Sequence, residues 1–486
     1  MHKFTVKMIF LLAFASVLYS QNRGNDLLFQ GVTRESNNGV KAQAMAGAFT
    51  AYSGDLSSIF YNPAGLAEIN KIQISFSGNS YKRTWQETQE YRPNRQYTTL
   101  SFILDGLYRP NPDFNGFWDN EAFFNDTSYV VNEPELGTDV YGDGADWKEE
   151  KTATTLNNIA IAYPFELFET KFAVAAAYSR KYDILDYDRN DTYLDPHIGA
   201  NGYGGIPVKV ASEADALDVN WYEYSRSRTG EMNSYSAAIS ADVADFLNLG
   251  LTMNIADGNS TDYLHLNKVG VFTLAGQNQY SFTYDSLDNV DNGSSTFKST
   301  SFDVGALIKF ERFSLGVNLT LPYTVEKEWS STSTIASGKD EMDIPLSYTL
   351  GLKFTPVDNF TLTADVGKVS YGEADYQLSS VDSLLHNLVN QTSLRFGVEY
   401  KPIEDLSLMC GYKNITSVFI PDGAADKNSG PAFEGFSFGA SYKIYMVELI
   451  AAYEYNSMKY FDAYFSNTNY NKETFTNIYF GATISL

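Results

Sequence analysis

The chain has 486 residues, one cysteine and a net charge of −24. This charge excludes nucleic-acid binding, because a phosphate backbone requires a basic surface, and the lone Cys410 excludes a disulfide framework. Length and mean hydropathy do not fix the fold, since a membrane β-barrel alternates lipid-facing with lumen-facing residues and averages to near neutral.

The first twenty residues have the pattern of an export signal. Lys3 and Lys7 accompany an apolar run, Met8–Leu18, and the small Ser20 follows it. We therefore predict a signal peptide at residues 1–20. The run is too short for a transmembrane helix, and no later stretch approaches the roughly 18 uninterrupted apolar residues that a helical span requires.

The next segment, residues 21–70, differs from everything after it. Its main part, Gly39–Ile69, neither alternates nor has a disordered composition, and it is rich in alanine and glycine. Asn62-Pro63 is a turn signal, and Gly65 can adopt a positive φ. Small residues suit close packing inside another structure, so we predict that residues 21–70 form a compact plug.

From residue 71 onwards the dominant pattern is alternation. One run of eight residues sets four apolar side chains against four others, in the order Leu394, Arg395, Phe396, Gly397, Val398, Glu399, Tyr400, Lys401. A period of two indicates a strand with unlike faces. Similar runs begin at Phe313, Tyr348 and Leu406, and aromatic residues stand at strand ends, as in the girdles of membrane barrels. Residues 71–486 are therefore predicted to form a transmembrane β-barrel.

Connection lengths predict the number of strands. Six short turns each join two strands, and they lie near Phe165–Thr170, Ala241–Leu247, Glu311–Arg312, Pro356–Asn359, Pro402–Asp405 and Ile444–Tyr445. One strand before them and one after them bring the total to about 14, with both termini in the periplasm. Counting Tyr97–Leu104 as another barrel strand would place a later short turn outside the cell. We therefore assign this segment to the first external loop. The long loops include Asp183–Gly230, His265–Phe297 and Met458–Lys472.

At this point the plug segment shows a resemblance. The run Gly47–Leu66, with its Asn-Pro-Ala-Gly turn, resembles the N-terminal hatch of the FadL/TodX family of outer-membrane transporters. The resemblance implies a 14-stranded barrel that takes up long-chain fatty acids or aromatic hydrocarbons past a hatch inside the lumen. It also implies hatch or gating positions for six residues, namely Gly47, Asp55, Asn62, Pro63, Ala64 and Gly65. These residues serve either to shape the plug or to contact ligand.

The resemblance further implies a lateral exit beside the third strand, which kinks in the family. The third strand here is Lys171–Tyr182, and its Ala173, Ala175 and Ala177 leave room for an opening. We expect these alanines to mark the lateral opening.

Alternation places several charged residues on the inward face. They either pair with one another and stiffen the wall, or hold the carboxylate of a ligand. Arg395, Lys401 and Lys413 are the candidates for binding a ligand head group.

The functional prediction is passive uptake of hydrophobic small molecules across the bacterial outer membrane. No cofactor or metal is expected, and the chain is not expected to be an enzyme, because its few histidines lack ligand spacing. The expected partners are a hydrophobic ligand, outer-membrane lipid and lipopolysaccharide, and the barrel assembly machinery, which would read the alternating C-terminal strand ending at Leu486.

A second prediction belongs to another class of function. A barrel of this kind can also act as a docking or shuttle component of a protein-secretion system. Aromatic clusters in the long loops would then be contact points for a protein partner, and they comprise Phe114, Phe117, Trp118, Phe123, Phe124, Trp221, Tyr222 and Tyr224.

Overall fold

A computed structural model gives the fold. It describes residues 28–33, 38–90, 147–197, 217–274, 280–332, 336–379, 388–421, 424, 426–464 and 467–486. The predicted signal peptide, the Tyr97–Leu104 segment and the aromatic cluster from Phe114 to Phe124 lie outside these residues. So do the side chains of Trp221, Tyr222 and Tyr224.

The described chain is almost entirely strand. Its strands are β1 (Gln73–Glu90), β2 (Trp147–Leu167), β3 (Thr170–His197), β4 (Leu217–Ala244), β5 (Leu247–Leu274), β6 (Tyr280–Lys309), β7 (Phe313–Thr320), β8 (Tyr323–Ser331), β9 (Ser337–Ile344), β10 (Ser347–Val357), β11 (Phe360–Val369), β12 (Asp375–Gln377), β13 (Gln391–Ile403), β14 (Leu406–Thr416), β15 (Ala432–Ile444), β16 (Val447–Tyr464) and β17 (Asn467–Ser485). Four short helical pieces accompany them, namely α2 (Val40–Ala44), η2 (Leu56–Phe60), η3 (Pro63–Glu68) and η6 (Tyr371–Glu373). Among the described residues, no helix is long and apolar enough to cross a membrane.

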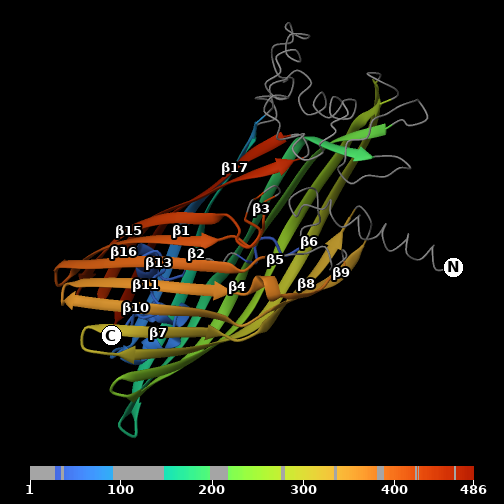
Figure 1. Ribbon diagram of the computed structural model, residues 1–486. Coiled ribbons are helices and arrows are strands. Elements are labelled where there is room, and N and C mark those ends of the chain that lie inside the picture. The colour runs from blue at the N-terminus through green and yellow to red at the C-terminus, as the bar shows by residue number, and fades with distance from the viewer. Residues whose placement is uncertain are drawn as a thin grey trace.

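The strands form one closed antiparallel barrel (Figure 1). β1 pairs with β2 on one side and with β17 on the other, which closes the sheet. β7 and β8, β9 and β10, and β11 and β12 are successive pieces of single passes, so the 17 strands make 14 passes. The prediction of about 14 strands is confirmed. All six predicted short turns lie at one end, which we call the turn end, together with the C-terminus.

The wall has the alternation that a membrane requires. On β5, Leu249, Leu251, Met253 and Ile255 are all exposed, whereas Asn248 and Thr252, at alternate positions, are fully buried. Leu394, Phe396 and Tyr400 are likewise exposed on β13, as predicted. An exposed apolar band on a closed barrel is the architecture of outer-membrane proteins, so the chain is an integral membrane barrel of this type.

Several strands continue far beyond the apolar band. The 28 residues of β4 span about 90 Å, whereas the band of such barrels is only about 25 Å tall. The predicted loops Asp183–Gly230, His265–Phe297 and Met458–Lys472 are therefore wrong for much of their length, because β3 to β6, β16 and β17 run through them. Outside the membrane the outer face of a strand no longer needs apolar side chains, so the regular alternation disappears from the sequence.

Candidate ligand cavity and lateral seam

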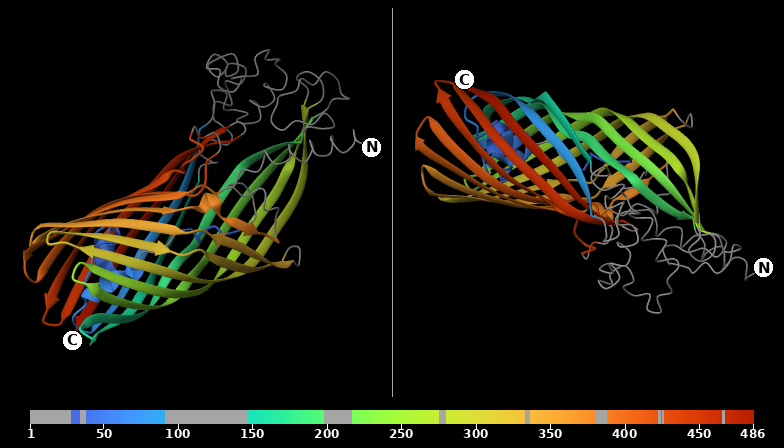
Figure 2. Two further views of the ribbon diagram at one scale, coloured as in Figure 1. Left: turned by 60° about the horizontal axis from the view of Figure 1, so that its bottom comes forward. Right: turned by 90° about the horizontal axis from the view of Figure 1, so that it is seen from above.

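Residues 38–69, which we call the lumenal segment, lie inside the barrel towards its turn end (Figure 2). Within the segment, α2 contacts β14 to β17, while η3 contacts β3 to β6 on another part of the wall. Nearly all of its residues from 38 to 52 are buried. The segment thus reaches from one side of the lumen to the other.

Glycines on the wall allow this segment to approach closely. A Cβ added at any of eight wall glycines would lie 2.1–2.9 Å from an atom of the lumenal segment, closer than real Cβ contacts. This glycine ring has members on eight strands, and they are Gly250, Gly305, Gly316, Gly351, Gly397, Gly411, Gly439 and Gly481. The backbone of the segment therefore packs directly on the backbone of the wall.

On β2 to β4, alanines instead of glycines pack against the lumenal segment. Ala173, Ala175 and Ala177 are buried with Leu56 and Leu66 of the lumenal segment in one apolar cluster. These three alanines, which were expected to mark a lateral opening, face the lumen in a stretch where β3 is paired on both sides.

The predicted hatch residues shape the segment. The Asp55 carboxylate accepts a hydrogen bond from the Ser57 N–H at 2.8 Å and so caps η2. Asn62 caps η3 by accepting from the Ala64 N–H, and Pro63 stands at the first helical position. The Asn62 amide also donates to the carbonyl of Ala306 on β6 at 3.0 Å, which fixes the turn to the wall.

The two predicted glycines have different roles. A Cβ at Gly65 would lie 2.6 Å from the carbonyl oxygen of Tyr52, so a tight fold of the segment requires glycine there. Gly47 has a φ of 76°, which favours glycine, and it lies beside the Arg395 side chain at the edge of an open space.

Ionic contacts fasten the segment to the wall. The Tyr52 hydroxyl donates to Glu399 of β13 at 2.7 Å, and Lys41 forms an ion pair with the same carboxylate at 3.3 Å. Asp365 of β11 accepts hydrogen bonds from the N–H groups of Phe49 and Thr50, both at 2.9 Å. Such buried charges cost much to leave unpaired, so these contacts oppose withdrawal of the segment.

Above the lumenal segment lies a cavity of about 840 Å³. This is within the range of small-molecule sites. Phe60 and Tyr61 of the segment line it from below, and Tyr371 and Tyr376 line it from the loop side. Part of the wall is polar, since four side chains hydrogen-bond in a chain across β4 to β7, in the order Ser236, Asn254, Asp303 and Thr320. The cavity thus offers both aromatic surfaces and hydrogen-bonding groups.

The three residues predicted to bind a ligand head group differ in whether they line the cavity and in whether a carboxylate already pairs with them. Lys413 lines the cavity, but it forms a buried ion pair with Glu454. Lys401 does not line the cavity and lies 4.0 Å from Glu399. Arg395 lines the cavity and makes no hydrogen bond or ion pair with any residue that the structure describes. Its strand neighbour Asp365 is engaged by the lumenal segment. Arg395 is therefore the cation best placed to accept an anion.

The barrel wall has a seam between β2 and β3. These strands pair from Leu167 and Thr170 up to Asn158 and Ser179, and within the described residues they do not pair beyond that point. Above it, β2 pairs only with β1, and β3 pairs only with β4. Asn157 and Ser179, at the base of the seam, line the cavity.

Two bulges account for the seam. The registers of β1–β2 and β3–β4 shift at Asn157 and at Lys181, each of which is an extra residue in its strand. A bulge bends its strand and increases the twist, so β2 and β3 diverge at the level where both bulges occur. The lumenal segment reaches this point, because the Asn38 amide donates to the Arg180 carbonyl at 3.0 Å.

Beyond the bulges, β3 passes along the lumenal face of β1 and β2. Tyr187 of β3 makes an edge contact with Trp147 at 5.3 Å between ring centroids, and it lies 6.1 Å from Trp85. Leu185 is buried in the same cluster with Tyr81. The two sheet edges therefore overlap, and aromatic side chains close the loop-side end of the seam.

The barrel is similar to solved structures of outer-membrane channels. A crystal structure of a Pseudomonas aeruginosa FadL homologue matches 93% of this chain and 98% of its own, at 13% identity and a TM-score of 0.58. This chain has the fold of the FadL-type channels. The deltaS2S3 mutant of the TodX monoaromatic hydrocarbon channel matches 93% of this chain and 99% of its own, at 12% identity and a TM-score of 0.51. Sequence comparison finds no matching family model and no matching curated protein.

Sequence reasoning missed the residues of the seam. No pattern distinguishes Lys181 from an ordinary strand residue, because a bulge becomes visible only when the registers on the two sides of a strand are compared. A weak signal was available at Asn157-Asn158, where two polar residues interrupt the alternation of β2.

Proposed function

We propose that this barrel is a passive channel through which hydrophobic small molecules enter the outer membrane. The observation that carries the proposal is the connection of the cavity to the seam. The lumenal segment fills the turn-end side of the lumen, and among the described residues the seam between β2 and β3 gives a ligand in the cavity a short way out.

The position of the seam supports a lateral exit into lipid. Leu156 and Ile159, on the outer face of β2 beside the seam's base, are exposed members of the apolar band. A molecule leaving at this level meets hydrocarbon rather than water. Ala173, Ala175 and Ala177 support the exit indirectly, since they hold the lumenal segment against the paired lower half of β3. The segment is then the plug of the channel.

Arg395 supports an amphipathic acid as substrate. A guanidinium in an enclosed, partly apolar space binds a carboxylate more strongly than it would in water. An apolar tail would lie against the aromatic side chains of the cavity. Transport needs no cofactor or catalysis, and the FadL homologue and the hydrocarbon channel of similar fold agree with a transport function.

The cavity and its connection to the seam support transport over a docking role in secretion, for which a sealed polar lumen would be expected. Other partners that we propose are the outer-membrane lipid and lipopolysaccharide around the apolar band, and the assembly machinery acting on β17. The C-terminal strand pairs with β1 and closes the barrel.

Uptake by cells tests the proposal. A host that lacks its own fatty-acid channel would express the wild type, Arg395→Gln, or Arg312→Gln as a control. Arg312 is an exposed cation at the turn end, paired with Asp358. Loss of a charged hydrogen bond of about 2 kcal/mol predicts roughly thirtyfold weaker binding of oleate for Arg395→Gln. Toluene uptake should not change. Equal oleate uptake by all three proteins would contradict the assigned role of Arg395, and no uptake by the wild type would contradict the transport proposal.

A further inference from the structure

Residues 28–33, which we call the strap, lie apart from the lumenal segment, on the inner face of the wall beyond the apolar band. Their fold is a turn in which the Val32 N–H donates to the Phe29 carbonyl at 3.0 Å. Gly31 has a φ of 90°, and a Cβ there would lie 2.8 Å from Cα of Ile184 on β3. Only glycine meets both conditions, so this turn is built to dock on β3.

The strap fills an apolar pocket. Leu28, Phe29 and Val32 are at most 5% exposed. They pack in one cluster with side chains from six strands and η6, and the partners are Tyr182, Ile184, Met232, Ala256, Phe297, Val325, Met342, Ile344 and Tyr371. These wall residues would present a continuous apolar surface if the strap left it.

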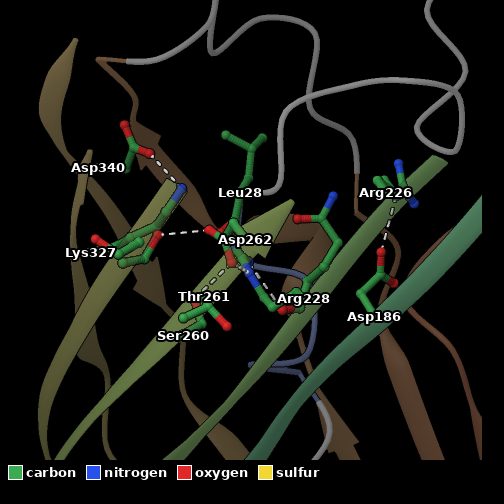
Figure 3. A network of polar contacts seen from close by, with 12 residues as sticks. Leu28, Asp186, Arg226, Arg228, Ser260, Thr261, Asp262, Lys327 and Asp340 are labelled. Carbon is green, nitrogen blue, oxygen red and sulfur yellow. Dashed lines mark hydrogen bonds and ion pairs between the residues drawn. The ribbon is translucent and has the colours of Figure 1, made fainter. Parts of the chain in front are cut away.

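The polar end of the pocket is Arg228, whose side chain is fully buried (Figure 3). Its Nε and Nη2 both donate to the Asp262 carboxylate at 2.7 Å. Its Nη1 donates to the carbonyl oxygens of Leu28 at 2.9 Å and of Gln30 at 3.3 Å. The strap thus places neutral oxygen acceptors on Arg228 and apolar side chains in the pocket.

The charges around Arg228 are balanced. Asp262 neutralises Arg228, and the buried Lys327 pairs with Asp340 at 3.2 Å in the same network (Figure 3). A carboxylate brought to Arg228 would meet Asp262 as well, and like charges in a buried site repel. A neutral acceptor avoids this repulsion. The chemistry of the pocket therefore differs from that of Arg395. No carboxylate in the described residues hydrogen-bonds to Arg395, and its neighbour Asp365 interacts with it only through charge while accepting hydrogen bonds from the lumenal segment.

We propose that the wall pocket is a second ligand site, for an apolar chain that ends in a neutral oxygen acceptor such as an ester, and that the strap is its built-in competitor. Leu28 and Phe29 also line the 840 Å³ cavity, so displacement of the strap joins the pocket to it. This pocket lies on the loop side of the Arg395 site, so a ligand entering from the loops would bind in it before reaching Arg395. The inference deepens the transport proposal and rests on it only for the order of binding.

Binding to the purified protein tests the proposal. Gly31→Ala should release the strap, because the added Cβ meets the backbone of β3 and the positive φ is strained. The control is Thr33→Ala, which leaves the turn intact. The probes are radiolabelled methyl laurate, laurate and dodecane, titrated against protein held in an amphipol. If the strap occupies the pocket more than nine-tenths of the time, its release raises the affinity for methyl laurate about tenfold or more.

The three probes separate the outcomes. The proposal predicts that Gly31→Ala strengthens methyl laurate binding more than it strengthens binding of dodecane or laurate, and that Thr33→Ala changes none of them. It also predicts that adding Arg228→Met with Asp262→Leu, which removes the donor without leaving a lone charge, abolishes the gain. An equal gain for all three probes, or no gain for methyl laurate in a barrel that remains folded by its gel mobility shift on heating, would overturn it. This readout is independent of Arg395, so a failure of the uptake test leaves it interpretable.

Discussion

The two halves of the lumen are packed in different ways. In the turn-end half, wall and lumenal segment meet through glycine and alanine, backbone against backbone, and the eight members of the glycine ring leave no room for a side chain. In the loop-side half, large side chains such as Phe29, Tyr371 and Tyr376 leave a cavity of about 840 Å³ between them. Both halves belong to one continuous sheet.

This difference assigns the two halves different tasks. The turn-end half seals the lumen, and the loop-side half lets a ligand enter and leave. Close backbone packing with buried ion pairs such as Lys41–Glu399 makes a seal that is costly to open. Loosely filled space beside a break in strand pairing can admit and release a molecule without moving the seal. We infer that the ligand path bypasses the lumenal segment instead of passing through it.

The largest expected effect comes from filling the glycine ring. A Cβ at Gly411 would lie 2.4 Å from the backbone carbon of Met45. Gly411→Ala should therefore destabilise the folded barrel by about 1–3 kcal/mol, as overpacking does. The urea concentration at which the heat-modifiable band disappears on a gel measures this.

The control for this change is Gly372→Ala, at an exposed position of η6, where the nearest atom is the side-chain amide oxygen of Asn390 at 3.1 Å. It should leave the urea midpoint unchanged. Equal midpoints for Gly411→Ala and the wild type would mean that the lumenal segment is not held against the wall, and the contrast between the halves would fail.

A smaller effect is expected from narrowing the seam. Ser179→Trp puts an indole where β2–β3 pairing ends, and it should slow uptake of oleate severalfold because the exit is obstructed. Ser236→Trp, which narrows the same cavity on the β4 wall away from the seam, is the matched comparison. If both variants lower uptake in proportion to their loss of ligand binding, the seam is not the exit.

The smallest expected effect is on the free energy of unfolding of the barrel, which should depend on pH through Lys327 in the network near the strap. Burial, followed by repulsion from Arg228, lowers the pKa of Lys327 to about 8 even though Asp340 is its partner. β8, which carries Lys327, lies beyond the apolar band. An unfolded lysine keeps its proton up to about pH 10.4. Between pH 8 and pH 10.4 the unfolded state thus binds more protons, and the free energy of unfolding should rise with pH.

Lys327→Arg isolates this contribution, because arginine keeps its charge throughout the window. The difference in urea midpoint between wild type and variant should shift in favour of the wild type from pH 7 to pH 10. Parallel pH profiles would show that Lys327 does not titrate in this range.

The sequence predicts the parts of this protein that depend on local pattern. Alternation at Leu394–Lys401 and the six tight turns predict the barrel and its 14 passes, because a membrane imposes a period of two on every spanning strand. The pattern ends with the membrane. The extensions of β3 to β6, such as residues 183–189 of β3, lack the regular alternation of the apolar band, and they appear as loops in the sequence.

The site is only partly predictable, because it depends on pairings between distant residues. Arg395, Lys401 and Lys413 are equivalent by alternation. Only the structure separates them, since Glu454 engages Lys413 and Glu399 lies near Lys401. The seam arises from the registers of two strand pairs, and the strap pocket is built from seven elements, so neither has a local signature.

Native mass spectrometry of the protein purified in a short-chain detergent, with lipid analysis of what it releases, tests the central claim most directly. The claim is that the cavity above the lumenal segment holds a hydrophobic ligand. We expect one bound hydrophobic molecule per barrel, with an acid retained by the wild type and lost from Arg395→Gln. A folded wild-type barrel that carries no such molecule, even after incubation with oleate, would contradict it.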